Sequence, residues 1–166
     1  MIAFVSCVGS PETHARRALP GLHRVGEPGS VAGQVTSDRS IFEAYNRALD
    51  HFGAFEDLEA LVLMHEDVEL FDRDFGERVR RALADPQVAV VGAVGAREVE
   101  SLAWWHGEVA GLCFQAREAG RRVVVTELTL FHHTEGGLGD SDAFQAANRA
   151  FRAKWGFFPV DVEIAA

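Results

Sequence analysis

The 166-residue sequence contains few cysteines and an unusually small share of basic residues among its charges. Its 2 cysteines exclude the disulfide framework that stabilises many small secreted domains. The 16 lysines and arginines are outnumbered by 25 aspartates and glutamates, which gives a formal net charge of −9. That charge argues against nucleic acid or an anionic membrane surface as the principal partner. A chain this acidic that binds phosphate needs a metal ion or a few local cations.

Long hydrophobic runs are lacking as well. The longest run, over 88–96, is much shorter than the ~20 residues that a membrane-spanning helix needs. The apolar N-terminal segment has no basic residues before it, so we interpret it as a first strand rather than a signal peptide. Cys7 and Cys113 each lie in an apolar run, where a buried reduced thiol is the expected state. We therefore expect a cytoplasmic protein with no membrane span.

The residues that are present describe an ordinary globular chain, 48% hydrophobic and 25% charged. Domains usually contain ~100–200 residues, so the length predicts a single domain over 1–166. Continuous apolar runs at 2–8, 58–64, 88–94 and 123–130 predict strands that are buried on both faces. Their alternation with amphipathic segments is typical of an α/β protein, a three-layer sandwich with a mostly parallel sheet.

Helices are predicted between these strands from capping residues, periodic apolar positions and helix-ending glycines. Pro11 begins a short helix that reaches 17–19, and a short strand is expected near 22–25. Ser40 and Glu43 form a capping box for the next helix, which Gly53 ends. The remaining predicted helices are one capped by Asp72, one over 111–119 that ends at Gly120, and one over 141–155.

The segments that follow three of the predicted strands form the candidate functional site, because open parallel sheets bind ligands beyond the carboxyl ends of their strands. In one of them, His65 and Asp67 lie two positions apart and face one side of an extended chain, with Glu66 on the other. Two such groups can hold one divalent cation; the alternative is a merely acidic exit from the strand. The three segments are 6–12, 65–69 and 131–135.

His132 and His133 form a second candidate cluster after the last predicted strand. Adjacent residues on a strand point to opposite faces, so at most one of the two readily joins a shared site. Taken alone, the pair favours exposed or hydrogen-bonded histidines over metal ligands. Both clusters are expected at the same edge of the sheet. Trp104 and Trp105 either stack on a base or sugar or pack over the sheet.

Several common nucleotide-binding and catalytic motifs are missing. The glycines at 136, 137 and 139 lack the spacing and position of a dinucleotide-binding fingerprint, and no segment matches a phosphate-binding loop. The Gly-x-Ser-x-Gly turn of the Ser-His-Asp hydrolases is also missing. If the chain binds a phosphate-bearing ligand, it does so by other means.

A series of segments along nearly the whole chain resembles one known family when it is taken in order. It comprises Ile2 to Val8, Glu43-Ala44-Tyr45-Asn46, Leu63 to Val68, Val91 to Ala96, Trp104-Trp105-x-Gly107, Leu112 to Gly120 with the following strand and histidine, and Phe151-x-x-Lys154-Trp155. These segments resemble the streptomycin-biosynthesis-type glycosyltransferase-like proteins, which are relatives of the inverting family 2 of GT-A glycosyltransferases.

The resemblance implies a compact GT-A fold that binds a nucleotide-diphospho-sugar. It implies that Asp67, with His65 beside it, binds Mg²⁺ or Mn²⁺ on the donor diphosphate. It also implies that His132 or His133 completes the metal site. The donor-binding residues that it implies are Ser6, Cys7, Val8, Tyr45, Asn46, Glu66 and Trp105.

The sequence departs from the family's pattern on the acceptor side. Relatives carry an acidic pair before the helix that begins near Leu112, and one of its carboxylates acts as general base. Here Glu108 is the carboxylate nearest to that position. The segment between Trp105 and Leu112 is also much shorter than in relatives.

Two hypotheses about function remain open, the first favoured by the ordered segments and the second by these departures. The first is a metal-dependent glycosyltransferase, and the second is an inactive, shortened GT-A-like domain with a nucleotide-binding, structural or oligomeric role. A shortened acceptor wall would expose apolar surface of the sheet, so we expect a homodimer that covers it.

Overall fold

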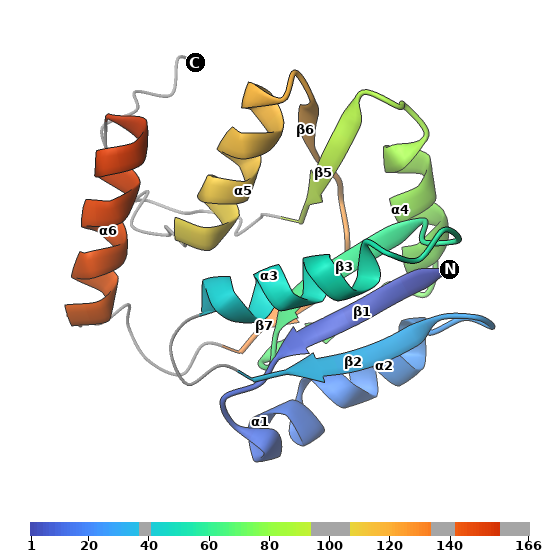
Figure 1. Cartoon of the computed structure of the whole chain (residues 1–166). Coiled ribbons are helices and arrows are strands. Elements are labelled where there is room, and N and C mark those ends of the chain that lie inside the picture. Colours follow the sequence, from blue (N-terminus) through green and yellow to red (C-terminus); the bar gives the residue numbers. More distant parts are fainter. Residues whose placement is uncertain (37–40, 94–106, 134–141, 157–166) are drawn as a thin grey trace. The chain divides into compact units, whose positions relative to one another are not determined.

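A computed structural model describes residues 1–36, 41–93, 107–133 and 142–156 (Figure 1). The chain divides into two compact units. The first contains residues 1–85 and 126–134, and the second contains residues 86–125 and 135–166. The single domain over 1–166 stays a prediction, and each unit is described separately below.

The first unit is built on a three-stranded parallel sheet with the strand order β2–β1–β3. The central strand β1 (Ile2–Cys7) lies between β2 (Val31–Val35) and β3 (Ala60–His65). β1 is buried almost throughout, as expected of an apolar strand covered on both faces. The parallel register sets Cys7 opposite His65 at the carboxyl edge of the sheet.

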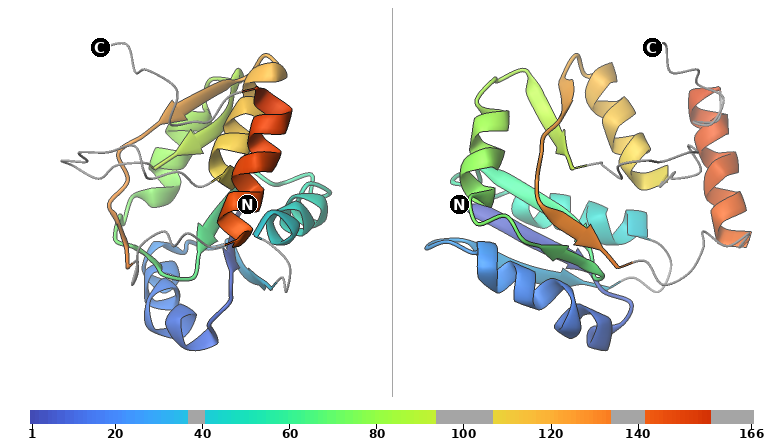
Figure 2. Two further views of the ribbon diagram at one scale, coloured as in Figure 1. Left: turned by 90° about the vertical axis from the view of Figure 1, so that its left-hand side faces the viewer. Right: turned by 180° about the vertical axis from the view of Figure 1, so that it is seen from behind.

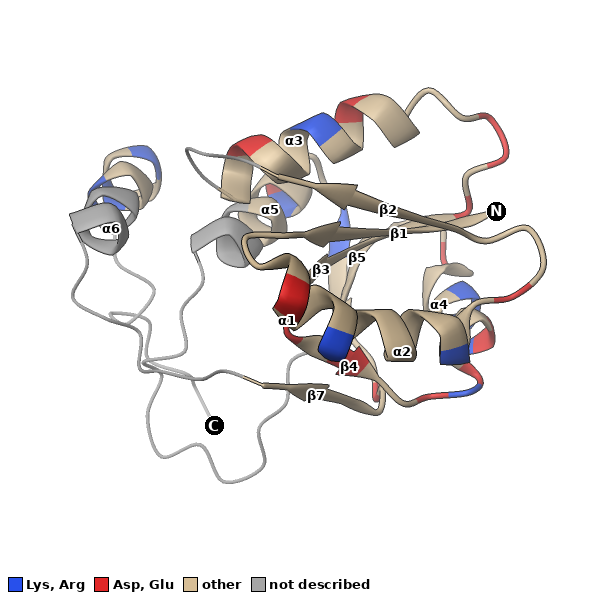
Figure 3. Ribbon diagram, turned by 90° about the horizontal axis from the view of Figure 1, so that it is seen from below, with Lys and Arg blue, Asp and Glu red and all other residues tan. Residues whose placement is uncertain are grey.

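Helices lie on both faces of this sheet, as Figure 3 shows. α3 (Ile41–Phe52) covers one face, and its buried Ala44 and Ala48 allow a close approach to the strands. α1 (Pro11–Arg16) and α2 (Ala18–Val25) lie on the opposite face (Figure 3). The first unit therefore has the layered helix–sheet–helix arrangement of an α/β protein.

The hydrophobic core of the first unit lies between the sheet and the layer that contains α2 and α4 (Phe75–Leu83). Phe4 of β1 packs against Phe75, with ring centroids 5.5 Å apart. Ile2 and Leu22 join the same cluster. Each fully buried side chain of this kind contributes about 1.5–3 kcal/mol of hydrophobic stabilisation.

A second, two-stranded sheet follows directly from β3. The chain turns at Glu66 and Asp67 into β4 (Val68–Leu70), which pairs antiparallel with β7 (Leu130–His132), as the rear view in Figure 2 shows. The register sets Val68 opposite His132. A segment far away in the sequence is thus brought to the carboxyl edge of β3.

The second unit contains a parallel pair of strands and two described helices. β5 (Val88–Gly92) pairs with β6 (Arg122–Val125), and α5 (Gly107–Glu118) lies between them in the sequence. Phe114 of α5 packs against Trp155 of α6 (Asp142–Trp155), with ring centroids 5.1 Å apart. Aromatic contacts therefore join the two helices.

The structure confirms an α/β architecture and the strands expected at 2–8, 58–64 and 88–94, which form β1, β3 and β5. The strand expected near 22–25 is wrong, because these residues form the end of the amphipathic helix α2. The strand expected over 123–130 is also wrong, since this run is divided between β6 and β7.

The structure also differs from the sequence-based expectations in its short strands and in one helix cap. β2 and β4 were not expected, and the pairing of β4 with β7 is antiparallel. Asp74 rather than Asp72 takes the N-cap position of α4. Ser40 of the predicted capping box lies outside the described residues. Neither Cys7 nor Cys113 forms a disulfide bond, and both are half-buried. None of the described helices is long and apolar enough to cross a membrane.

Gly21 of α2 allows the helix to approach β4 closely. A Cβ atom at this position would lie 2.5 Å from the backbone nitrogen of Leu70 and 3.1 Å from its carbonyl oxygen. Because both atoms belong to the backbone, β4 must move to relieve the clash. We expect Gly21→Ala to lower the free energy of unfolding by about 1–3 kcal/mol in a urea titration.

Gly33→Ala in β2 is the matched control for this experiment. A Cβ atom there meets the side chains of Phe52 and Val5 at 3.9 Å, an ordinary van der Waals contact. We expect this variant to keep the wild-type stability. Equal stabilities of the two variants would contradict the tight packing of α2 on β4.

Candidate metal centre

Three side chains meet at the carboxyl edge of β3. One ligand atom from each of His65, Asp67 and His132 lies within 4.8 Å of the other two. His65 is the last residue of β3, Asp67 lies in the following turn, and His132 ends β7. All three residues are half-buried. Their ligand atoms are close enough together to bind one metal ion.

The local backbone explains why these residues meet. The turn after β3 keeps His65 and Asp67 on the same side of the chain, as their spacing predicts. The antiparallel register brings the end of β7 next to this turn. A backbone hydrogen bond closes the arrangement, since the N–H of His133 donates to the carbonyl oxygen of Asp67 at 2.9 Å.

The Oδ1 atom of Asp67 is a buried hydrogen-bond acceptor. Its Oδ1 atom has no hydrogen-bond partner in the part of the chain that the structure describes. His132 Nε2 lies 3.1 Å away, but without hydrogen-bond alignment, and it forms an ion pair only when it is protonated. A buried, unsatisfied carboxylate oxygen costs free energy. A cation between the three side chains removes that cost, so the residues fit a metal ion.

The donor set also indicates which ions fit. The rings of His65 and His132 meet edge to face, with centroids 5.6 Å apart. Imidazole nitrogens suit first-row transition ions, whereas Mg²⁺ prefers an all-oxygen shell. Two imidazoles and one carboxylate also leave coordination positions for water or a ligand. Of the two expected ions, Mn²⁺ therefore fits this centre better than Mg²⁺.

His133 lies apart from the three ligands. Its Nε2 atom is 3.2 Å from Glu69 Oε2, and its ring packs against Phe131 with centroids 4.6 Å apart. Adjacent side chains of a strand point to opposite faces, so only one of the two histidines reaches Asp67. In the structure that residue is His132.

Glu66 is not one of the three candidate ligands. Its carboxylate accepts hydrogen bonds from the backbone N–H groups of Gly9 and Ser10, the second at 2.7 Å. These bonds tie the end of β3 to the turn between β1 and α1. The structure thus gives Glu66 a contact with the backbone of the first unit.

The other candidate residues lie on several elements, and Cys7 of β1 is opposite His65 of β3 in the parallel register. Ser6 and Val8 are buried at the end of β1, and the hydroxyl of Ser6 has no hydrogen-bond partner among the described residues. Cys7 is half-buried. On α3, Tyr45 is half-buried and Asn46 is exposed. Trp105 lies outside the described residues, and Glu108 lies in α5, where its side chain is not described.

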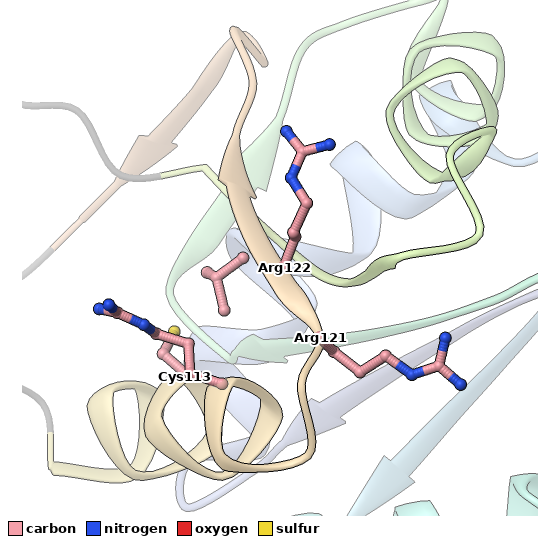
Figure 4. A pocket seen from close by; sticks show the side chains of 5 residues that line it. Cys113, Arg121 and Arg122 are labelled. Atoms are coloured by element: carbon pink, nitrogen blue, oxygen red, sulfur yellow. The ribbon is translucent and has the colours of Figure 1, made fainter.

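A hollow of about 410 Å³ lies in the second unit, between α5 and β6 (Figure 4). The labelled side chains of Arg121 and Arg122 point in different directions, and Arg121 donates to the carbonyl oxygen of Pro86 at 2.8 Å. Burial raises the pKa of the Cys113 thiol, which makes it a weak nucleophile near neutral pH. The other lining residues are Arg117 and Val123. Because these arginines diverge, the hollow lacks the convergent charges of an anion site.

The chain is similar to a protein whose name refers to streptomycin biosynthesis. It is 39% identical to the streptomycin biosynthesis protein StrF of Streptomyces griseus over 106 residues. The matched segment covers 64% of this chain and 37% of StrF, so the chain spans well under half of that protein's length. No family model matches the chain. The likeness supports the streptomycin-biosynthesis part of the resemblance seen in the sequence.

His14 of α1 is a buried histidine near Glu66. It is 3% exposed, and its Nε2 atom has no hydrogen-bond partner among the described residues. Burial lowers the pKa of His14 from its ordinary value of 6.5, and the negative charge of Glu66 opposes this. The folded protein therefore binds this proton less tightly than the unfolded chain does.

We expect His14 to make the protein less stable in acid. A depressed pKa in the folded state means that stability falls as the pH drops below about 6.5 and through the folded pKa. His14→Phe removes this contribution. The measurement is the free energy of unfolding of both proteins in urea at several pH values. The difference between them should change below about pH 6.5 and stay constant above it; parallel curves would contradict the assignment.

Proposed function

We propose that this chain binds a divalent transition-metal ion at His65, Asp67 and His132 and, through that ion, the diphosphate of a nucleotide sugar. In this proposal the protein is a metal-dependent glycosyltransferase with a compact GT-A-like fold. The observation that carries the proposal is the group of three candidate ligands around the buried Oδ1 atom of Asp67, which accepts no hydrogen bond from the residues that the structure describes.

The position of the group supports a ligand site. The three side chains lie at the carboxyl edge of a parallel sheet, where α/β proteins bind their ligands. The net charge of −9 makes a polyphosphate an unfavourable partner for this chain unless a cation intervenes. A bound divalent ion would neutralise the charge that develops on the leaving diphosphate during sugar transfer.

The likeness to StrF supports a biosynthetic role. Transfer of a sugar from an activated donor is one reaction class that biosynthesis uses. The donor residues that we propose besides the metal ligands are Ser6, Cys7, Val8, Tyr45, Asn46, Glu66 and Trp105, with Glu108 as general base from its place in the sequence. The homodimer and the cytoplasmic location also stay predictions.

A second candidate function is nucleotide binding without sugar transfer. This function is favoured by the short segment between Trp105 and Leu112. In the family that the chain resembles, this segment is longer and includes a strand that forms one side of the acceptor site. In that case the metal centre binds a nucleotide diphosphate, and no acceptor hydroxyl reaches the sugar.

The metal ligands are tested by titration with Mn²⁺, followed by the electron paramagnetic resonance signal of the free ion. We expect wild-type protein to bind one Mn²⁺ per chain. Asp67→Asn removes the charged ligand, and its affinity should fall by more than about 100-fold, beyond the range of outer-shell changes. Glu66→Gln is the matched control, since this neighbouring carboxylate contacts Gly9 and Ser10 instead. Equal losses in both variants would contradict the assignment.

The ligand is tested by calorimetry with UDP, dTDP and GDP, each with and without Mn²⁺. At least one nucleotide should bind more tightly in the presence of Mn²⁺, and Asp67→Asn should abolish the difference. Binding of none of them to the Mn²⁺-loaded protein would contradict both candidate functions. Release of sugar from the matching nucleotide sugar would separate an enzyme from a passive binding domain.

A further inference from the structure

We propose that Glu69 and His133 are positioning residues for the metal centre. Their contact fixes the register of β7 on β4, and this register puts His132 rather than His133 beside Asp67. The inference rests on the proposed metal site, and it gives a role to a hydrogen-bonded pair that contributes no ligand.

One residue of register decides which histidine faces Asp67. Because successive side chains alternate between faces, a slip of β7 by one residue would exchange the places of His132 and His133. The ladder that must prevent this slip is short. It consists of three opposed pairs, Val68 with His132, Glu69 with Phe131, and Leu70 with Leu130.

The apolar pattern of β7 specifies its register only weakly. Leu130 packs against the core cluster of the first unit, while its neighbour Phe131 is 56% exposed. Both are large and apolar, and each is followed two positions later by a histidine. The two faces of the strand are therefore nearly equivalent in sequence, which is the situation in which strands are prone to slip.

Side chains on the face opposite the metal ligands remove this ambiguity. Glu69 and His133 are each 17% exposed, and Glu69 Oε2 lies 3.2 Å from His133 Nε2. Glu69 Oε1 pairs with Arg24 of α2 at 3.4 Å. Arg24 in turn donates to the carbonyl oxygen of Leu70 at 2.6 Å, and its guanidinium lies over the ring of Phe71. Glu69 thus links β7 to both β4 and α2.

A second set of contacts holds the residue that precedes β7, Thr129, in place. Asp72 is 7% exposed and pairs with Arg78 at 3.1 Å. Its Oδ2 atom accepts from the backbone N–H of Thr129 at 3.4 Å, and the N–H of Phe71 donates to the carbonyl oxygen of Thr129 at 2.8 Å. These contacts locate the entry of the segment, and the Glu69–His133 pair locates its end.

The first test compares the Mn²⁺ affinity of Glu69→Ala and Glu69→Gln. Loss of a group that contacts a ligand directly typically lowers metal affinity 10–100-fold. Glu69 acts through His133 and the register of β7, so we expect a loss at the lower end of that range, about 10-fold, for Glu69→Ala. Glutamine keeps an oxygen that accepts from the ring of His133, so Glu69→Gln should stay within about threefold of wild type. The control is Glu77→Ala, which removes an exposed glutamate that pairs with Arg81 on α4. Every variant is measured at a temperature at which its circular dichroism shows it to be folded.

The second test needs no metal. The N–H of His133 donates to Asp67 across the ladder, so its hydrogen exchange reports the register directly. We expect faster exchange at His133 in Glu69→Ala, with unchanged exchange at Phe4 in the central strand. Wild-type Mn²⁺ affinity or wild-type His133 protection in this variant would overturn the inference. If wild-type protein binds no Mn²⁺, the metal site is wrong, and the exchange rates still decide whether Glu69 fixes the register.

A variant of the partner residue covers the case in which Glu69→Ala does not fold. His133→Phe keeps an aromatic ring against Phe131 and loses the contact with Glu69. We expect the same loss of about 10-fold in Mn²⁺ affinity. A loss above about 100-fold would make His133 a ligand and overturn its positioning role, and an unchanged affinity would overturn it as well.

Discussion

The carboxylate of Asp67 is the group on which the rest of this account depends. Its Oδ1 atom is buried at the end of a parallel strand without a hydrogen-bond donor among the described residues. An isolated carboxylate in such a place destabilises the fold unless a positive charge compensates it. Protonated His132 provides one compensation, and a metal ion bound by His65, Asp67 and His132 provides another that also offers coordination positions to a ligand. In the second arrangement, the surrounding strands and turns serve to position the three metal ligands.

The architecture builds this centre from segments that are far apart in the sequence. β3 and the turn after it supply His65 and Asp67, while His132 lies on a segment that follows residues 86–125 of the second unit along the chain. Because β7 has only three residues, it forms few backbone hydrogen bonds, and further contacts are needed to hold it beside β4. Part-buried polar contacts of Asp72 at the entry and of Glu69 at the end of the segment hold it in place.

The sequence predicts the local parts of the site better than their assembly. The alternation of His65, Glu66 and Asp67, and that of His132 and His133, follows from strand geometry, and the structure agrees with both. The antiparallel pairing of β4 with β7 could not be predicted from the sequence. Residues 123–130 have the composition of one continuous buried strand, although the two ends of this run belong to different units. β2 was missed because its glycine and exposed residues lack an apolar pattern. The sequence indicated no separate role for Glu69 and only a helix cap for Asp72, because their partners, Arg24, His133 and Arg78, lie far away along the chain.

The most direct test of the metal centre is anomalous diffraction from crystals of this protein grown with Mn²⁺. The account predicts an anomalous peak about 2.0–2.3 Å from ligand atoms of His65, Asp67 and His132, the ordinary range of metal–ligand bonds. His133 should remain paired with Glu69 in the same crystal. Empty density among the three side chains at saturating Mn²⁺, or a peak bound by His133 in place of His132, would contradict it.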